Sequence, residues 1–165
     1  MKQSRSDHSE YYDTFRSSIG TLYLIFWSSS LKGISFEKPV GIIPRQTKYS
    51  IAAKKELGEY FLEGRMEFSI KTSFAEGTEF EKEVWTLLAG IPYGETRTYK
   101  WIADKMGKPH ASRAVGNALA KNPIPVIYPC HRIIESDGSI GGYTPGIDIK
   151  RRLLEIEYYT KLSKA

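Results

Sequence analysis

The sequence has a single cysteine, Cys130, and only three histidines in 165 residues. One cysteine excludes a disulfide within the chain, which fits a reducing compartment. So few Cys and His residues also argue against a zinc site, so we expect no metal. A lone cysteine is more often a small buried hydrophobe than a reactive group, and its neighbours must decide between the two.

Long apolar runs are also missing, since no stretch approaches the roughly 18 residues that a membrane-spanning helix needs. The first eight residues are polar with no apolar segment after them, which is unlike a secretory signal. Hydrophobic residues make up 41% and charged residues 26%, an ordinary globular balance. We therefore expect a cytoplasmic protein, in one domain or two small ones, with no membrane partner.

The net charge of +5 is unevenly distributed along the chain. Residues 1–79 carry a net charge of +1, whereas residues 80–165 carry +4. A basic C-terminal half weakly favours an anionic partner such as a nucleic acid.

The N-terminal half predicts a small mixed α/β unit. Polar residues 1–12 are expected to be loosely ordered. Residues 18–27 are rich in β-branched and aromatic side chains, and apolar residues 34–36 follow a turn, which predicts two strands. Prolines and glycines over 37–48 predict a loop.

A helix is expected next, with Ser50 as its N-cap and Gly64 as its end. Its apolar residues recur with helical spacing. A short strand is expected at 68–70.

The C-terminal half begins with a helix that Thr78 and Glu81 would start as a capping box. Thr98 can cap a second helix, over residues 99–106, that ends at Gly107. Pro109 suits the first turn of a third helix.

Two short helices joined by a glycine turn have the helix-turn-helix pattern, although an ordinary helical hairpin has the same spacing. Arg113 and Asn117, four residues apart, share the outer face of the second helix. The residues expected to face inward are Ala111, Ala114, Val115, Ala118 and Leu119.

The segment 122–134 contains three prolines, which favour extended backbone, and is mostly apolar, so we expect it to be extended and buried. A turn at 136–138 and a glycine-rich loop at 141–146 come next. A final helix is expected over 149–159.

Cys130 is followed directly by His131. A thiolate is the nucleophilic form of cysteine, and a nearby imidazole can take its proton. In a regular strand, neighbouring side chains point to opposite faces, so contact between these two requires a turn, which Pro129 favours.

A third group should orient the imidazole, as in catalytic triads. Glu155 and Glu157 are both candidates, and helical register favours Glu157. Arg132 could anchor the segment on a carboxylate. Asn122 could tie the helix-turn-helix to the cysteine segment or could simply end the helix.

The run from Pro129 to Ile133, Pro-Cys-His-Arg-Ile, resembles the signature of the O6-alkylguanine-DNA alkyltransferases, also called methylated-DNA–protein-cysteine methyltransferases. The likeness continues in order from about Gly77 to Glu157. It includes Val84-Trp85, Ile91-Pro92-Tyr93-Gly94, Thr98-Tyr99, Ser112 to Gly116, Asn122-Pro123, Gly141-Gly142-Tyr143 and Lys150. The N-terminal half matches loosely, at residues 19–22 and at Tyr60-Phe61 with Gly64.

The resemblance implies an α+β fold with two domains. Residues 1–72 would form a small ribonuclease-H-like α/β domain. Residues 73–165 would form a helical domain with a winged-helix-like helix-turn-helix and the active-site cysteine.

The resemblance also implies residue roles. Cys130 would accept the alkyl group, His131 would act as its base through a water, and Glu157 would polarise His131. Asn122 would link the recognition helix to the active site, and Tyr99 would hold the extruded nucleotide and donate a proton to guanine O6.

Arg113 would enter the base stack after the damaged base is flipped out. Small residues would face the minor groove, namely Ala111, Ala114, Gly116 and Ala118, with Asn117 beside them. The base pocket would be formed by Val126, Tyr143 and Thr144.

The implied activity is a single, irreversible transfer of an alkyl group from O6-alkylguanine in double-stranded DNA to Cys130, by a monomer without cofactors. Family members that bind zinc use N-terminal cysteines, which this chain lacks. Two alternatives stay open from the residues: a Cys-His hydrolase, which would need an oxyanion hole, and a lesion-binding sensor or regulator.

Overall fold

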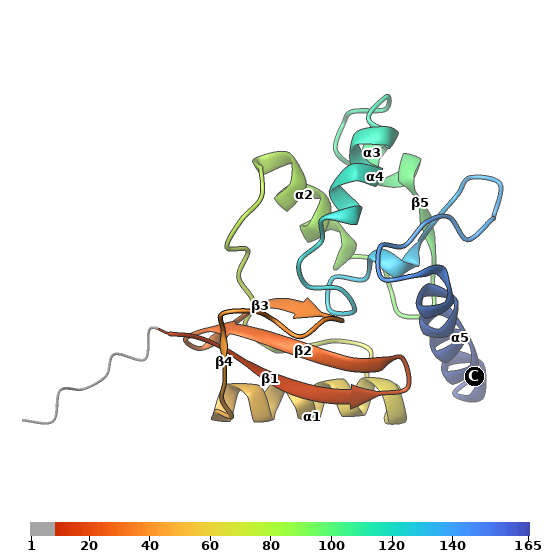
Figure 1. The fold of residues 1–165 in the computed structure, drawn as a ribbon. Coiled ribbons are helices and arrows are strands. Elements are labelled where there is room, and N and C mark those ends of the chain that lie inside the picture. The colour runs from red at the N-terminus through yellow and green to blue at the C-terminus, as the bar shows by residue number, and fades with distance from the viewer. Residues whose placement is uncertain (1–8) are drawn as a thin grey trace, which may run out of the picture.

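A computed structural model describes residues 9–165 of the chain, which fold into a small sheet with one helix on its outer face and a helical layer on the other (Figure 1). Part of the stretch expected to be loosely ordered, residues 1–8, lies outside the described residues. Mixed α and β structure confirms the predicted fold class.

The sheet has four strands in the order β3-β2-β1-β4. Strand β1 (Glu10–Ser17) forms a hairpin with β2 (Gly20–Trp27), and β3 (Ser30–Ser35) pairs antiparallel with β2. The short strand β4 (Ile43–Pro44) lies parallel to β1. The turn into β2 places Gly20 at a φ of 113°, a value that favours glycine.

Several sequence predictions for this half are wrong. Residues 10–12 are not loosely ordered but begin β1, because Tyr11 and Tyr12 are buried in the sheet. The predicted loop over 37–48 contains β4. Residues 68–70 form no strand, and only Thr72 nearby makes an isolated bridge, to Leu31 of β3.

Helix α1 (Lys48–Glu63) covers the outer face of the sheet (Figure 1). Its N-cap is Thr47 rather than Ser50, and Ser50 completes a capping box as the third residue of the helix. The predicted end is confirmed, because Gly64 adopts a left-handed φ of 73°.

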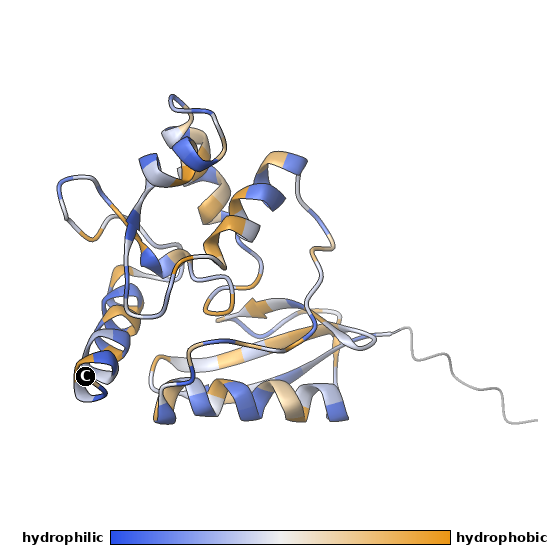
Figure 2. Ribbon diagram, turned by 180° about the vertical axis from the view of Figure 1, so that it is seen from behind, coloured by the Kyte–Doolittle hydropathy of each residue, from blue (hydrophilic) through white to orange (hydrophobic). Residues whose placement is uncertain are grey.

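The upper layer contains α2 (Glu79–Leu88), α3 (Tyr99–Lys105) and α4 (Ser112–Ala120). The predicted N-caps of the first two, Thr78 and Thr98, are confirmed by side-chain hydrogen bonds. Gly107, with a φ of 70°, follows the end of α3 as expected. Figure 2 shows hydrophobic residues gathered where α2 and α4 face each other.

Two predictions for this half are corrected. Pro109 does not lie in the first turn of α4 but in the turn that precedes it. Segment 122–134 is buried in places, but it is extended only at its end, because residues 123–132 fold into turns and a 3-10 turn, η1 (Cys130–Arg132).

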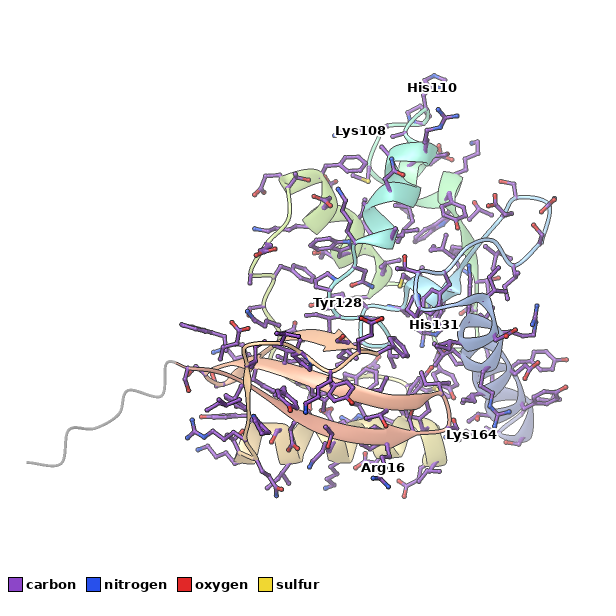
Figure 3. All side chains as sticks on the ribbon, in the orientation of Figure 1. Arg16, Lys108, His110, Tyr128, His131 and Lys164 are labelled. Carbon is purple, nitrogen blue, oxygen red and sulfur yellow. The ribbon has the colours of Figure 1, made fainter. Side chains whose placement is uncertain are left out.

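The chain then forms β6 (Ile133–Ile134), which pairs parallel with β5 (Arg97–Thr98). The final helix, α5 (Ile147–Ser163), is longer than the 149–159 predicted. Its C-terminal end reaches α1, where Lys164 donates to the carbonyl oxygens of Glu63 and Gly64 (Figure 3).

Two hydrophobic clusters hold the fold together. One combines the sheet and α1 with residues from the C-terminal half, such as Ile124 and Leu153. The other lies among α2, α3 and α4 and includes Cys130, and the indole of Trp85 joins α2 to α4 by donating to the Ala118 carbonyl at 2.7 Å. Within residues 9–165, no helix is both long and apolar enough to cross a membrane.

Burial should decide the effect of removing leucine side chains from α1. Leu57 is fully buried and Leu62 is 86% exposed on the same helix. We expect Leu57→Ala to lower the free energy of unfolding by about 2–5 kcal/mol through the lost packing and the cavity left behind. Leu62→Ala should change it by less than about 0.5 kcal/mol. Urea unfolding monitored by circular dichroism measures both, and equal losses would contradict the described packing of α1.

Candidate active site

Cys130 lies at the first position of η1 and lines a cavity of about 330 Å³. The residue is 8% exposed and packs in the core of the helical layer. The cavity is lined by residues from α3, α4 and the glycine-rich loop, namely Tyr99, Gly116, Leu119, Ala120, Gly142, Tyr143 and Thr144. The predicted pocket residues Tyr143 and Thr144 therefore do lie beside the cysteine.

A second cavity, of about 280 Å³, also reaches Cys130. It shares Tyr143 and Thr144 with the first and adds residues from the N-terminal half, Ile34 to Glu37. Both halves of the chain therefore form the surroundings of the sulfur.

Val126 is not in either of these cavities, which corrects the prediction that it lines the base pocket. Its side chain is 1% exposed and packs with the sheet-side core. Its φ of 73° is unusual for a β-branched residue and belongs to the tight turn that precedes the cysteine.

Cys130 and His131 lie in a 3-10 turn. Their side chains are therefore not forced to opposite faces, as they would be in a regular strand. His131 is fully buried, and its Nε2 lies 2.5 Å from Oε2 of Glu157 on α5. Glu155 is exposed on the same helix, so the structure places Glu157, and not Glu155, against the imidazole. Figure 3 shows His131 between the cysteine turn and α5.

Arg132 anchors the same turn on the same carboxylate. Its Nε donates to Oε1 of Glu157 at 2.7 Å, and its NH2 group donates to Oε2 at 3.1 Å. The remaining guanidinium donor reaches the Ile91 carbonyl at 2.7 Å. The predicted anchoring of Arg132 by a carboxylate is therefore confirmed, and a planar guanidinium is the side chain best suited to this forked contact.

Burial and pairing set the protonation of these groups. Burial raises the pKa of the Cys130 thiol, and the Asn122 side chain and the charge of Lys150 only partly oppose this shift. Burial lowers the pKa of His131, although Glu157 opposes that shift. Burial would raise the pKa of Glu157, but His131 and Arg132 hold it well below its usual range. At neutral pH the site therefore contains a neutral thiol, a neutral imidazole and an ionised carboxylate.

Asn122 connects the end of α4 to the cysteine turn. Its side-chain amide donates to the Tyr128 carbonyl at 2.8 Å, and its side-chain oxygen accepts from the backbone of Ile124 at 3.1 Å. These bonds confirm the predicted tie between α4 and the cysteine segment.

The predicted helix-turn-helix lies at the far end of the molecule from the sheet, where Figure 3 labels Lys108 and His110 between α3 and α4. Arg113 and Asn117 are exposed on α4, as predicted. Ala114 is exposed rather than inward, because its position lies next to Arg113 on the outer face.

Ala118 is 2% exposed and packs into the helical core, so it does not lie on the docking face as the resemblance implied. Ala111 and Gly116 are half-buried. Tyr99 is half-buried beside Gly116 and lines the cavity of Cys130, and burial raises the pKa of its phenol.

Two buried polar residues near the site had no role assigned from the sequence beyond a place in the resemblance. Lys150 is fully buried and donates to the carbonyls of Ile133 at 2.6 Å and Gly142 at 3.1 Å, so it ties the glycine-rich loop to β6. Tyr60 looked like a core residue of a helical stripe, yet its hydroxyl reaches Glu157. In the sequence, the only signal for either role was a polar side-chain group, an ammonium or a hydroxyl, on a face expected to be buried.

Among residues 9–165, no group of three or more His, Cys, Asp or Glu side chains is placed to hold a metal ion.

Comparison with known proteins places this geometry in a family. The sequence model of the 6-O-methylguanine DNA methyltransferase DNA-binding domain matches residues 79–159. A Methanosarcina barkeri protein named methylated-DNA–protein-cysteine methyltransferase is 46% identical over 155 residues, with 89% of this chain and 96% of that protein covered. A Mycobacterium tuberculosis protein of the same name is 40% identical over 153 residues, with 89% of this chain and 92% of that protein covered.

Solved structures agree. The crystal structure of the Mycobacterium tuberculosis O6-methylguanine methyltransferase superposes with a TM-score of 0.84 at 40% identity, over 92% of this chain and 94% of that one. The structure of the Mycobacterium tuberculosis OGT in complex with DNA gives a TM-score of 0.85 at 40% identity, over 91% and 94%. With the cysteine turn, its buried histidine and carboxylate, and these relatives over nearly their whole length, the chain belongs to the methylated-DNA–protein-cysteine methyltransferase family.

Proposed function

We propose that this protein repairs alkylated DNA by direct reversal, moving the alkyl group from O6-alkylguanine in duplex DNA onto Sγ of Cys130. The observation that carries the proposal is the position of the single cysteine, which lines a cavity and directly precedes a buried His131–Glu157 pair. The relatives named as methyltransferases support it over a Cys-His hydrolase or a lesion sensor.

The chemistry follows from the protonation of the site. Burial keeps Cys130 as a thiol, so the reaction needs a base, and neutral His131 takes the thiol proton through a bridging water. The imidazolium that forms is stabilised by the ionised Glu157. The thiolate attacks the alkyl carbon, the bond from carbon to guanine O6 breaks, and Tyr99 donates a proton to the departing base. The thioether is stable, so each molecule acts once.

Access to the alkyl carbon requires the base to leave the helix. A base inside a duplex does not reach a buried sulfur, so the damaged nucleotide must be flipped into the cavity at a cost of a few kcal/mol. Arg113 is exposed on α4, where it would fill the gap in the stack. Small residues beside it, Ala114 and Gly116, suit a close approach to the minor groove. Asn117 is exposed on the same helix.

Two further assignments belong to this proposal. We place a domain boundary between residues 72 and 73, with the sheet and α1 on one side and the alkyltransferase helices on the other. The two hydrophobic clusters support this division, although the first also draws on the C-terminal half. We also propose a cytoplasmic location, because the reaction needs Cys130 as a free thiol.

Self-alkylation gives the most direct test. After incubation with a duplex that contains O6-methylguanine, the intact protein should gain the mass of one methylene, because a methyl group replaces the thiol proton. Peptide mass spectrometry should place the change at Cys130, and Cys130→Ala should remove it. An unchanged mass with tight lesion binding would instead identify a sensor, and turnover without a mass change would identify a hydrolase.

Arg113 should matter for extrusion rather than for chemistry. We expect Arg113→Ala to slow transfer from duplex DNA about tenfold or more, because unstacking costs a few kcal/mol. Reaction with free O6-benzylguanine, which needs no extrusion, should change little. The control is Arg16→Ala, which removes an exposed arginine at the opposite end of the molecule (Figure 3). Equal losses on both substrates would rule out a role of Arg113 in base flipping.

Glu157 should stabilise the fold in a pH-dependent way. At pH 7, Glu157→Gln should lower the free energy of unfolding by about 3–5 kcal/mol, because it leaves Arg132 buried without its charged partner. The matched control Glu155→Gln, on the exposed face of the same helix, should change it by less than about 0.5 kcal/mol.

The pKa of Glu157 is held below its ordinary value of 4.5 in the folded state. The stabilisation is therefore complete above about that pH and is lost progressively as the pH falls below it. Urea unfolding at a series of pH values should show the gap between wild type and Glu157→Gln narrowing towards low pH. A gap that stays constant from neutral to acid pH would contradict an ionised, paired Glu157.

A further inference from the structure

The carboxylate of Glu157 receives a donor from the other half of the chain. The hydroxyl of Tyr60, on α1, donates to Oε2 of Glu157 at 2.5 Å. The same oxygen lies 2.5 Å from Nε2 of His131. Tyr60 and Glu157 are each 1% exposed and His131 is fully buried, so solvent does not replace any of these contacts.

We propose that Tyr60 is a positioning residue of the transfer reaction, which holds the Glu157 carboxylate in place against His131 and limits the negative charge that Oε2 presents to the imidazole. The inference rests on the proposed function, in which His131 takes the proton of Cys130. It gives the N-terminal half a direct part in the chemistry through a residue that does not touch the substrate.

The direction of the bond from Tyr60 is fixed. An ionised carboxylate only accepts hydrogen bonds, so the phenol must donate. Burial, reinforced by the charge of Glu157, raises the pKa of Tyr60 well above its usual value, so the hydroxyl keeps its proton at neutral pH.

The ring of Tyr60 is also held in place. It packs against Phe61, Phe68 and Tyr93, with ring centroids 5.0, 5.7 and 5.9 Å away. A ring fixed on three sides keeps its hydroxyl aimed at Glu157.

The contacts around the carboxylate divide between its two oxygens. Oε1 accepts from Nε of Arg132 at 2.7 Å and from the backbone of Gly94 at 3.1 Å. Oε2 is shared by Tyr60, His131 and the second Arg132 donor. Tyr60 therefore competes with His131 for the same oxygen. A donor on Oε2 draws off part of its charge, which weakens the stabilisation of a protonated His131.

The other charged groups that act on His131 are held by partners of their own. Arg132 donates to Glu157 and to the Ile91 carbonyl, and Lys150 on α5 donates to the Ile133 carbonyl. Of the titratable groups nearby, Cys130 precedes His131 in η1 and Tyr93 packs against Arg132. None of them is changed by removing the Tyr60 hydroxyl, so Tyr60→Phe alters a single bond to Oε2.

The experiment compares Tyr60→Phe with Tyr11→Phe. Tyr11 is also 1% exposed, and its hydroxyl makes partly buried hydrogen bonds, to the Ser28 carbonyl and to Thr47 at 2.8 Å, but none to Glu157. The two variants lose the same atom from the same half of the chain. A general effect of losing a tyrosine hydroxyl should therefore appear in both variants. Only Tyr60→Phe removes a hydrogen bond to the Glu157 carboxylate.

Three measurements are made on each variant and on wild type. Single-turnover transfer from an O6-methylguanine duplex gives the maximal rate and the half-saturating DNA concentration. The same rate, measured across a pH series, shows at which pH transfer slows on the acid side (the acid limb). The ring nitrogen shifts of His131, followed by NMR during a pH titration, give its pKa without any transfer.

For Tyr60→Phe we expect a maximal rate about tenfold lower at neutral pH, because more of His131 is then already protonated and the carboxylate has lost one of the donors that hold it in place. The half-saturating DNA concentration should stay unchanged. The acid limb and the pKa of His131 should both move to higher pH, because Oε2 then favours the imidazolium more strongly. Raising the pH should recover part of the rate, and Tyr11→Phe should match wild type throughout.

Wild-type rates and an unchanged His131 pKa in Tyr60→Phe would overturn the inference and leave Tyr60 as a packing residue. Equal slowing by both variants, again without a shift in the His131 pKa, would do the same. If wild type transfers no methyl group, the proposed function fails. The His131 titration still decides whether Tyr60 controls the Glu157–His131 pair.

Discussion

The ionised carboxylate of Glu157, buried among five donor contacts, is the interaction on which the rest of the structure depends. A buried charge is tolerated only when its oxygens are satisfied, and here the donors come from α1, from the turn before β5 and from η1. The cost of burying Glu157 therefore forces three distant segments of the chain to meet on α5. The same constraint fixes the position of His131.

The reactivity of Cys130 follows from this arrangement. The sulfur lies in the core of the helical layer, where burial favours the thiol over the thiolate. A buried thiol needs a nearby base to take its proton. The protonated base then needs an anion beside it to stabilise its charge. Glu157 supplies this stabilisation without solvent, and Arg132 keeps the carboxylate from rotating away.

Both halves of the chain contribute residues to the surroundings of the Cys130 sulfur. Residues 34–37 line one of the cavities that reach Cys130, and Tyr60 contacts the carboxylate behind it. On the other side, Asn122 ties α4, the helix that we propose faces DNA, to the turn that carries Cys130. In the proposed function, a few short hydrogen bonds therefore connect the DNA-binding helix to the alkyl acceptor.

The sequence by itself determined the local features of this protein. The capping residues Thr78 and Thr98 and the terminating Gly64 mark helix ends because capping is a local hydrogen-bonding property. The Pro-Cys-His-Arg run and the ordered motifs around it identified the family and indicated Cys130 as the nucleophile that we propose. Only the tertiary structure decided which carboxylate meets His131, that Val126 lies away from the cavity, and that Tyr60 belongs to the site. These depend on contacts between residues far apart in the chain, such as the 97 positions between Tyr60 and Glu157, which no local pattern encodes. Strand β1 escaped prediction for the same reason, because its tyrosines are buried only by the neighbouring elements of the folded sheet.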